Sequence, residues 1–165
     1  MKARIIPLAL LFIFLFTGCK SAKSKPQIKI EGISFAAHIT YQGANYVADC
    51  TVENENSITA VITEPESLSG LTVTYNGNNC LVRYGEMEIN NAERFLPQSC
   101  SIEMIKNVFS NLQSASFNGK HGNYEFKGDI NGHGFIFITT PAGLPVSLQI
   151  EDYQLTVDFR NVTCK

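Results

Sequence analysis

The chain lacks a hydrophobic run long enough to cross a bilayer. Its most apolar segment, residues 5–16, has twelve residues without a charge. A helix of that length spans roughly 18 Å, whereas the hydrocarbon core of a bilayer is ~30 Å thick. The segment is therefore a poor transmembrane anchor, but it has the length of the hydrophobic region of a signal peptide.

The spacings that mark metal sites and catalytic nucleophiles are also missing. There is no Cys-x-x-Cys pair, and His38, His121 and His133 lie far apart, so a zinc site has little support. Ser67 is not in the strand–turn–helix context of a nucleophile elbow, and the glycine-rich segment 128–134 sits between two predicted strands. We predict that the chain is not an enzyme and holds neither a metal nor a cofactor.

Positive charge is scarce in the body of the chain. From Ile30 onward, 7 Lys and Arg stand against 15 Asp and Glu, so this part has a net charge of −8. Such a domain repels phosphates, which excludes nucleic acid as an expected partner. The preceding segment 20–29 holds four lysines, which suit an anionic membrane surface, although a solvated linker is an equal alternative.

The N-terminal segment ends in a short signature. Residues 16–19, Phe-Thr-Gly-Cys, resemble the bacterial lipobox, whose usual form is Leu-(Ala/Ser/Thr)-(Gly/Ala)-Cys. The resemblance implies that residues 1–18 are a lipoprotein signal peptide and that Cys19 carries acyl chains as the first mature residue. The alternative is an ordinary signal peptide with an unmodified Cys19. We expect an extracytoplasmic protein anchored to the bacterial cell membrane, since each buried CH₂ contributes ~0.8 kcal/mol.

The rest of the chain divides simply. Residues 19–29 are predicted to be a lipidated flexible tether, because they are rich in Lys and Ser and have nothing to bury. Residues 30–165 have the length of one domain. The four cysteines of this domain permit two disulfides in three pairings, and free thiols are equally consistent with their wide spacing. These cysteines are Cys50, Cys80, Cys100 and Cys164.

Period-2 alternation dominates the domain and predicts antiparallel strands. Residues 33–89 contain about five such runs, separated by turn signals that include Pro65 and the Asn-Gly pair at 76–77. About four more runs follow residue 123, which brings the total near nine. Between the two groups, apolar residues recur at helical spacing over about 100–114, with Ser99 as a plausible N-cap.

These elements predict a mainly β (α+β) fold, in which one large curved antiparallel sheet forms a half-open β-barrel. One principal helix packs on the concave face and is too short to cover it, so part of the apolar face should remain as a groove or cavity. The alternative is a sheet that curls enough to fill itself. Candidate lining residues, chosen by face and position, are Phe35, Ile39, Ile62, Val73, Phe109, Phe135, Leu155 and Val157.

The strand pattern is similar to that of a known superfamily. Residues 58–89 contain a strand ending before Pro, a Leu-x-Gly-Leu segment, an Asn-Gly turn and a returning strand with Tyr-Gly, and residues 143–162 contain a Gly-x-Pro hairpin. This pattern resembles the LolA/LolB-like superfamily of envelope lipoprotein carriers and receptors, and the related membrane-anchored lipoproteins of Gram-positive bacteria. The resemblance implies a half-barrel over a hydrophobic cavity that holds acyl chains or a partner segment.

Two functions follow from these features. The first is a membrane-anchored lipoprotein whose half-barrel binds an apolar ligand, either an acyl chain or a lipidated partner. The second is an adaptor lipoprotein with a filled core that docks on a cell-envelope enzyme and modulates it. The two differ in whether the interior of the barrel is open or filled.

Overall fold

The alternating runs of the sequence form strands in the computed structural model, which describes residues 26–96, 100–120 and 122–164. The strands before the helix are β1 (Ile33–Tyr41), β2 (Ala44–Asn54), β3 (Ser57–Glu64), β4 (Thr72–Asn76), β5 (Asn79–Tyr84) and β6 (Met87–Asn90). Helix α2 (Ser101–Asn111) follows. The strands after it are β7 (Ser116–Lys120), β8 (Asn123–Ile130), β9 (His133–Thr139), β10 (Pro145–Ile150) and β11 (Leu155–Cys164).

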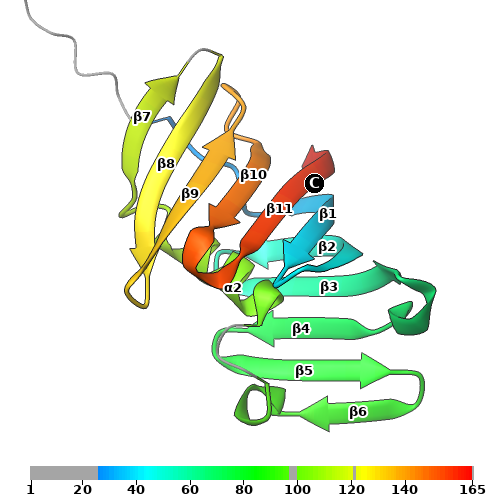
Figure 1. Cartoon of the computed structure of the whole chain (residues 1–165). Helices are drawn as coiled ribbons and strands as arrows, with labels where there is room; N and C mark the ends of the chain where they lie inside the picture. The colour runs from blue at the N-terminus through cyan, green and yellow to red at the C-terminus, as the bar shows by residue number, and fades with distance from the viewer. Residues whose placement is uncertain (1–25, 97–99, 121, 165) are drawn as a thin grey trace, which may run out of the picture.

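All eleven strands belong to one antiparallel sheet in the order β6-β5-β4-β3-β2-β1-β11-β10-β9-β8-β7. The first and last strands lie side by side at its middle, with Ile39 opposite Val157. Strands β6 and β7 form the two borders of the sheet (Figure 1). These two strands do not pair with each other, so the curved sheet does not close into a complete barrel. The predicted half-open barrel is therefore confirmed.

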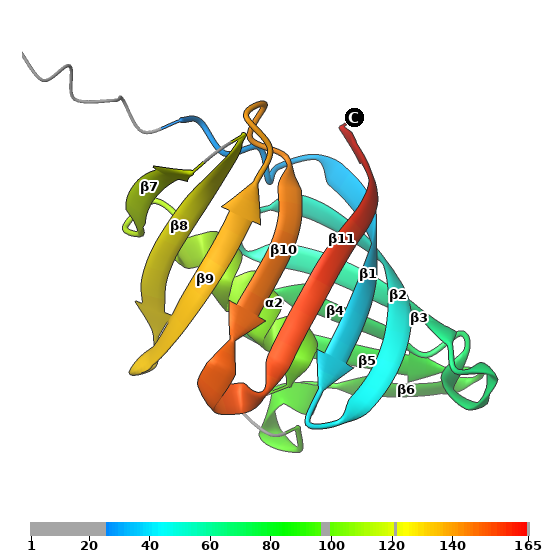
Figure 2. The same ribbon diagram turned by 45° about the horizontal axis from the view of Figure 1, so that its top comes forward.

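Helix α2 lies on the concave face of the sheet. It packs against β3, β4 and β8, and the curved sheet wraps around it (Figure 2). Its apolar stripe, which includes Ile102, Ile105 and Phe109, is buried. The helix is shorter at both ends than the predicted 100–114, because Cys100 is its N-cap and Leu112 is already its C-cap. The predicted N-cap Ser99 lies outside the described residues.

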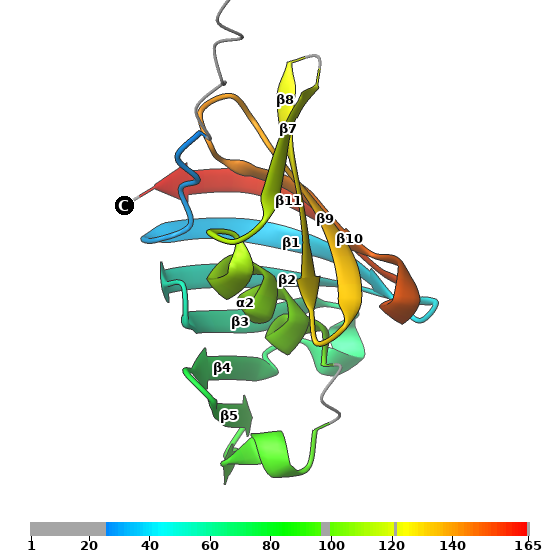
Figure 3. The same cartoon turned by 90° about the vertical axis from the view of Figure 1, so that its left-hand side faces the viewer.

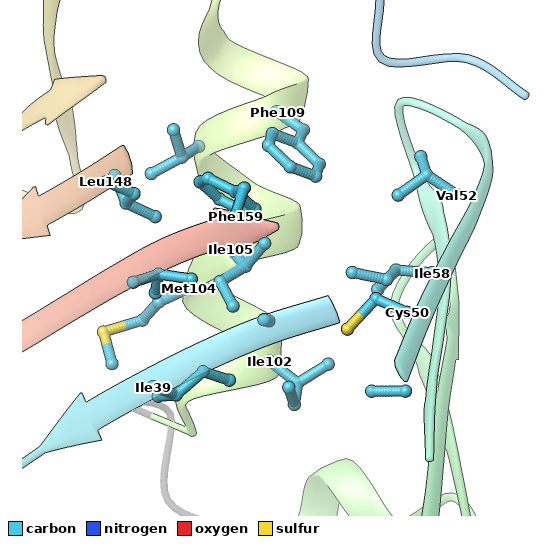
Figure 4. Packing of buried hydrophobic residues seen from close by; sticks show 14 of the residues in the cluster. Ile39, Cys50, Val52, Ile58, Ile102, Met104, Ile105, Phe109, Leu148 and Phe159 are labelled. Carbon is cyan, nitrogen blue, oxygen red and sulfur yellow. The ribbon is translucent and has the colours of Figure 1, made fainter. Parts of the chain in front are cut away.

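The space between helix and central strands is filled by aromatic rings. Phe109 of the helix meets Phe35 of β1 and Phe137 of β9 edge to face, with ring centroids 6.3 and 5.8 Å apart. Phe159 of β11 lies 5.0 Å from Phe35 and 6.1 Å from Phe109. Figure 4 shows Phe109 and Phe159 together between the helix and the strands. This part of the barrel is a packed core.

The strand count is higher than predicted in two places. The run 80–89 was expected as one strand, but it turns at Gly85, whose φ of +58° suits glycine, and so forms the hairpin of β5 and β6. Strand β7 was not expected, because its sequence Ser-Phe-Asn-Gly-Lys has one apolar side chain. It is stabilised by pairing with β8, with Phe117 opposite Phe126.

The segment leading into β1 is fixed to the sheet. Lys29 donates its backbone N–H to the carbonyl of Gly143 at 3.0 Å, in the β9–β10 connection. Gly143 has a φ of +82°, and a Cβ there would lie 2.2 Å from the carbonyl oxygen of Gln27. Glycine is therefore required for this crossing, which ties residues 26–30 across the end of β9 and β10.

Cys50, Cys80, Cys100 and Cys164 carry free thiols, so of the two alternatives left open the structure has reduced cysteines. None of the helices within the described residues is long and apolar enough to cross a membrane. The predicted signal peptide, lipid attachment at Cys19 and residues 20–25 of the tether lie outside the described residues and stay predictions.

Candidate functional site

The concave face of the sheet continues beyond the helix onto β5 and β6. Cys80 is buried and points to the helix side, and Val82 and Tyr84 follow it at the period of two that keeps strand residues on one face. Met87 lies opposite Tyr84, and Ile89 lies opposite Val82. Both β6 residues are thus on the apolar concave face.

These side chains form an apolar surface that is open to solvent. It encloses a shallow hollow of about 220 Å³, and we call it the β4–β6 surface; its residues are Leu68, Leu71, Val82, Tyr84, Met87 and Ile89. Leu71 and Val82 are partly buried and pack against the core, whereas Met87 is 65% and Ile89 49% exposed. The surface is therefore an uncovered continuation of the core.

Its exposure follows from the reach of the helix. Figure 3 shows α2 between the β1–β3 region and β8–β9, with β5 farther from the helix than β4. The buried Lys106 of α2 donates from Nζ to the carbonyl of Gly77 at 2.8 Å and lies 5.4 Å from the centre of the Tyr75 ring. This contact fixes the helix at the β4–β5 turn, so the opposite end of these strands remains uncovered.

The connection between β3 and β4 borders the surface. The hydroxyl of Tyr84 donates to the carbonyl of Ser67 at 3.2 Å, and Gly70 donates its N–H to the carbonyl of Ile62 at 2.9 Å. These bonds hold the short 3-10 helix Glu66–Leu68 beside β5, which places Leu68 at the rim of the hollow.

The segment of the chain that carries the β4–β6 surface is acidic. Between residues 64 and 96 the chain has two basic residues, Arg83 and Arg94, against five acidic ones, Glu64, Glu66, Glu86, Glu88 and Glu93. Arg83 donates from Nε to Glu88 at 2.7 Å, and this hydrogen bond holds the pKa of the Glu88 carboxyl below its usual value. The rim therefore carries a net negative charge.

A second hollow lies where the N-terminal segment crosses the end of the barrel. It measures about 620 Å³, and its wall includes Ile28, Ile30, Phe109 and Leu112 as well as polar groups such as Glu55. A third hollow, of about 350 Å³, has a wall of mixed polar and apolar side chains that includes His38 and Ile39. Among the described residues no cluster of three or more His, Cys, Asp and Glu could hold a metal ion.

The buried ionisable groups near the helix N-terminus are held neutral. Burial raises the pKa of Tyr75 and Cys80, which lie opposite each other on β4 and β5. Burial also raises the pKa of Tyr46 to about 12, although its hydroxyl is hydrogen-bonded to that of Ser101. Groups held in this way act as packing residues and do not supply a nucleophile or a base at neutral pH.

The eight residues proposed from sequence as cavity lining are all buried in the core: Phe35, Ile39, Ile62, Val73, Phe109, Phe135, Leu155 and Val157. Phe109 reaches the 620 Å³ hollow and Ile39 the 350 Å³ hollow. A contact between these side chains and a ligand stays a prediction.

The residues of the β4–β6 surface were not among those proposed. The sequence does contain a signal for them, because Val82 and Tyr84 and then Met87 and Ile89 repeat the alternation of the buried strands. The sequence pattern does not show how far the helix extends over the sheet, and this decides which apolar side chains are covered.

Two solved structures are similar to the chain in overall arrangement. One is a LolA superfamily protein from Nitrosomonas europaea, with 9% identity over 84% of this chain and 88% of that chain, and a TM-score of 0.46. The other is the CwlD amidase from Clostridioides difficile in complex with the GerS lipoprotein. The match there has 12% identity over 100% of this chain and 95% of that chain, and a TM-score of 0.42.

No protein-family model matches the chain, and a search of curated proteins gave no match.

Proposed function

We propose that the chain is a lipoprotein, anchored through Cys19 to the bacterial cell membrane, that docks a cell-envelope protein on its β4–β6 surface. The anchor rests on the lipobox-like segment 16–19. The docking role rests on the position of the exposed apolar side chains. All five large ones among the described residues lie between residues 68 and 95: Leu68, Tyr84, Met87, Ile89 and Phe95.

The hollow on this surface suits a protein partner better than a small molecule. Ligand pockets commonly enclose about 300–1,000 Å³ and bury most of the ligand. The hollow here is about 220 Å³ and shallow, which accommodates one or two side chains from a facing protein. The acidic rim also disfavours an anionic membrane as the occupant, because like charges repel.

Site-specific photo-crosslinking in cells tests the proposal. A photoreactive amino acid at Ile89, on the exposed concave side of β6, should give one discrete adduct with an envelope protein. The matched position is Asn90, the next residue of the strand, whose side chain points to the opposite face. The recovered partner should then bind the purified lipoprotein, and the Ile89→Glu variant should weaken this binding at least about tenfold.

The variant Asn90→Glu adds the same charge one residue away, on the opposite face, and should not weaken this binding by more than about twofold. Equal crosslinking from the two positions, or a partner that binds Ile89→Glu as tightly as the unmodified protein, contradicts the proposal.

A second candidate function is the binding of an apolar ligand at the barrel end. The observation that favours it is the hollow of about 620 Å³ beside residues 26–31, close in sequence to the proposed lipid anchor. A fluorescent fatty acid should then bind the protein, and Ile28→Glu should abolish the signal by placing a charge in the wall. The variant Ile89→Glu should not change it. A signal unaffected by Ile28→Glu would rule out this site.

A further inference from the structure

We propose that the segment docked on the β4–β6 surface is an extended one that pairs with the free edge of β6 and alternates apolar with basic residues. This inference rests on the proposed function and names the chemistry and binding mode of the partner. It is carried by three features of strands β4–β6: an open strand edge, apolar side chains beside that edge, and the negative charge of this segment.

Strand β6 is the border of the sheet, and in the described part of the chain its only strand partner is β5. An antiparallel strand directs half of its backbone N–H and C=O groups to each side. The outer groups of β6 are therefore available to a further strand, which is how sheet edges recruit extended peptides. Figure 1 shows this border at the end of the sheet opposite β7.

The side chains of β6 indicate that this edge accepts a further strand and is not simply protected against pairing. Natural edges are often short and charged, which deters pairing, and β6 has four residues and contains Glu88. Protection does not explain the strong exposure of Met87 and Ile89 on the same strand. At the other border, β7 has one large apolar side chain, Phe117, and it is partly buried against the core. The two edges are thus built differently.

The geometry of a sheet then fixes the pattern of the incoming segment. A strand added about 4.8 Å from β6 places every second side chain on the concave face, beside Met87 and Ile89. These positions require apolar residues, since they extend the hollow formed by Leu71 and Val82. The intervening side chains lie on the convex face, where Glu88 is the cross-strand neighbour.

Charge complementarity predicts basic residues at those intervening positions. Glu88 already accepts hydrogen bonds from Arg83 and Asn90, but an ionised carboxylate offers about four acceptor sites, so a further donor can bind. Glu86, in the turn before β6, adds a second charge of the same sign. Lysine or arginine opposite these groups gains the cross-strand attraction of opposite charges, whereas an acidic segment is repelled.

Designed peptides test this pattern before the partner itself is identified. The mature lipoprotein is reconstituted in nanodiscs of uncharged zwitterionic lipid, with empty nanodiscs as the blank. Fluorescence anisotropy then measures the binding of a labelled eight-residue peptide that alternates Lys and Val. Two controls accompany it: a peptide that alternates Glu and Val, and one with the same composition as the first but with its four Lys before its four Val.

We expect the alternating Lys/Val peptide to bind, and both control peptides to bind at least about tenfold more weakly. The variant Ile89→Glu should weaken binding of the Lys/Val peptide at least tenfold through loss of the apolar contact, and Asn90→Glu should leave it unchanged or tighten it. Bound peptide should also slow amide hydrogen exchange in β6, which a contact made by side chains alone would not do.

Equal binding of the Lys and Glu peptides, equal binding of the alternating and block peptides, or no binding at all would overturn the inference. None of these results would by itself contradict the proposal that a protein docks on the β4–β6 surface, because crosslinking from Ile89 tests that proposal separately. Loss of the Ile89 adduct with retained Lys/Val peptide binding would instead contradict the proposed function while leaving the edge chemistry intact.

Discussion

Val82 on β5 lies directly opposite Ile89 on β6, and this pair marks the limit of the covered apolar face. Val82 is partly buried and packs against the core, whereas Ile89 is 49% exposed. The two residues share one face of the sheet, so the difference between them comes from what lies above that face. Helix α2 is fixed to the β4–β5 turn through Lys106 and does not extend to the far end of β6.

Phe109 is predicted to be the most important core residue of the helix. The variant Phe109→Ala removes a ring that meets Phe35, Phe137 and Phe159, and it should lower the free energy of unfolding by about 3–5 kcal/mol. Urea denaturation followed by circular dichroism measures this loss. The control Phe95→Ala removes a ring that is 78% exposed and should change stability by no more than ~0.5 kcal/mol.

The crossing of residues 26–30 over Gly143 gives a prediction with an internal control. Gly143→Ala and Gly132→Ala both place a side chain at positive φ, which costs about 1–2 kcal/mol. A Cβ at Gly143 also meets the backbone of Gln27, whereas a Cβ at Gly132 has nothing within 4 Å. Only Gly143→Ala should therefore speed hydrogen exchange at the amide of Lys29. Equal exchange in both variants would contradict the fixed crossing.

Lys106 is predicted to stabilise the fold although it is a buried cation. Lys106→Met keeps most of the side-chain volume but removes the donor to the Gly77 carbonyl. The unpaired carbonyl should cost about 1–3 kcal/mol and speed amide exchange in the β4–β5 turn. The same change at the exposed Arg160 should have little effect. An unchanged unfolding midpoint for Lys106→Met would show that the helix is held at this turn by packing alone.

Thiol labelling should distinguish the cysteines. Burial raises the pKa of Cys50 to about 12, so at pH 8 its thiol is both protonated and shielded, while the exposed Cys164 reacts at once. In urea, four thiols should titrate with an aromatic disulfide reagent, because the fifth cysteine of the sequence, Cys19, is expected to be acylated. A fifth reactive thiol in the mature protein would contradict lipid attachment through sulfur.

The same burial predicts a loss of stability at high pH. The pKa of Cys50 is raised from 9.0 and that of Tyr46 from 10.0, each to about 12. Between those values the folded protein retains protons that the unfolded chain releases. Stability should therefore be insensitive to these groups below pH 9 and fall as pH rises toward 12, by ~1.4 kcal/mol per pH unit for each group. Denaturation midpoints across this range in Cys50→Ala should show a smaller decline.

The sequence predicted the architecture because its strands alternate cleanly and its turns are well marked. Pro65 follows the last residue of β3, and the Asn-Gly pair at 76–77 lies at the β4–β5 turn, as expected. The split at Gly85 was missed because both sides of it alternate apolar with polar residues, although the alternation shifts by one residue there, from Val82 and Tyr84 to Met87 and Ile89. Strand β7 was missed because its stability comes from β8, and pairing of this kind has no local signal.

The sequence predicts that part of the apolar face stays open, but it does not say which part. The expectation that one helix leaves part of the apolar face uncovered agrees with the β4–β6 surface. The eight residues proposed for the lining were selected for apolar character at positions of regular alternation. All eight are buried in the core, two of them reach the 620 and 350 Å³ hollows, and their contact with a ligand stays a prediction. That criterion finds the covered part of the face. Which part stays open depends on where Lys106 fixes the helix, and that is a tertiary contact.

Oxidation of methionine by hydroxyl radicals tests the central claim most directly. Met87 is 65% exposed on the β4–β6 surface, and Met104 is 1% exposed in the core, so one chain holds both the probe and its control. Mass spectrometry should find Met87 oxidised in the purified protein and protected in native membranes, with Met104 protected in both. Equal oxidation of Met87 in the two samples, or protection of Met87 in the isolated protein, would contradict the account.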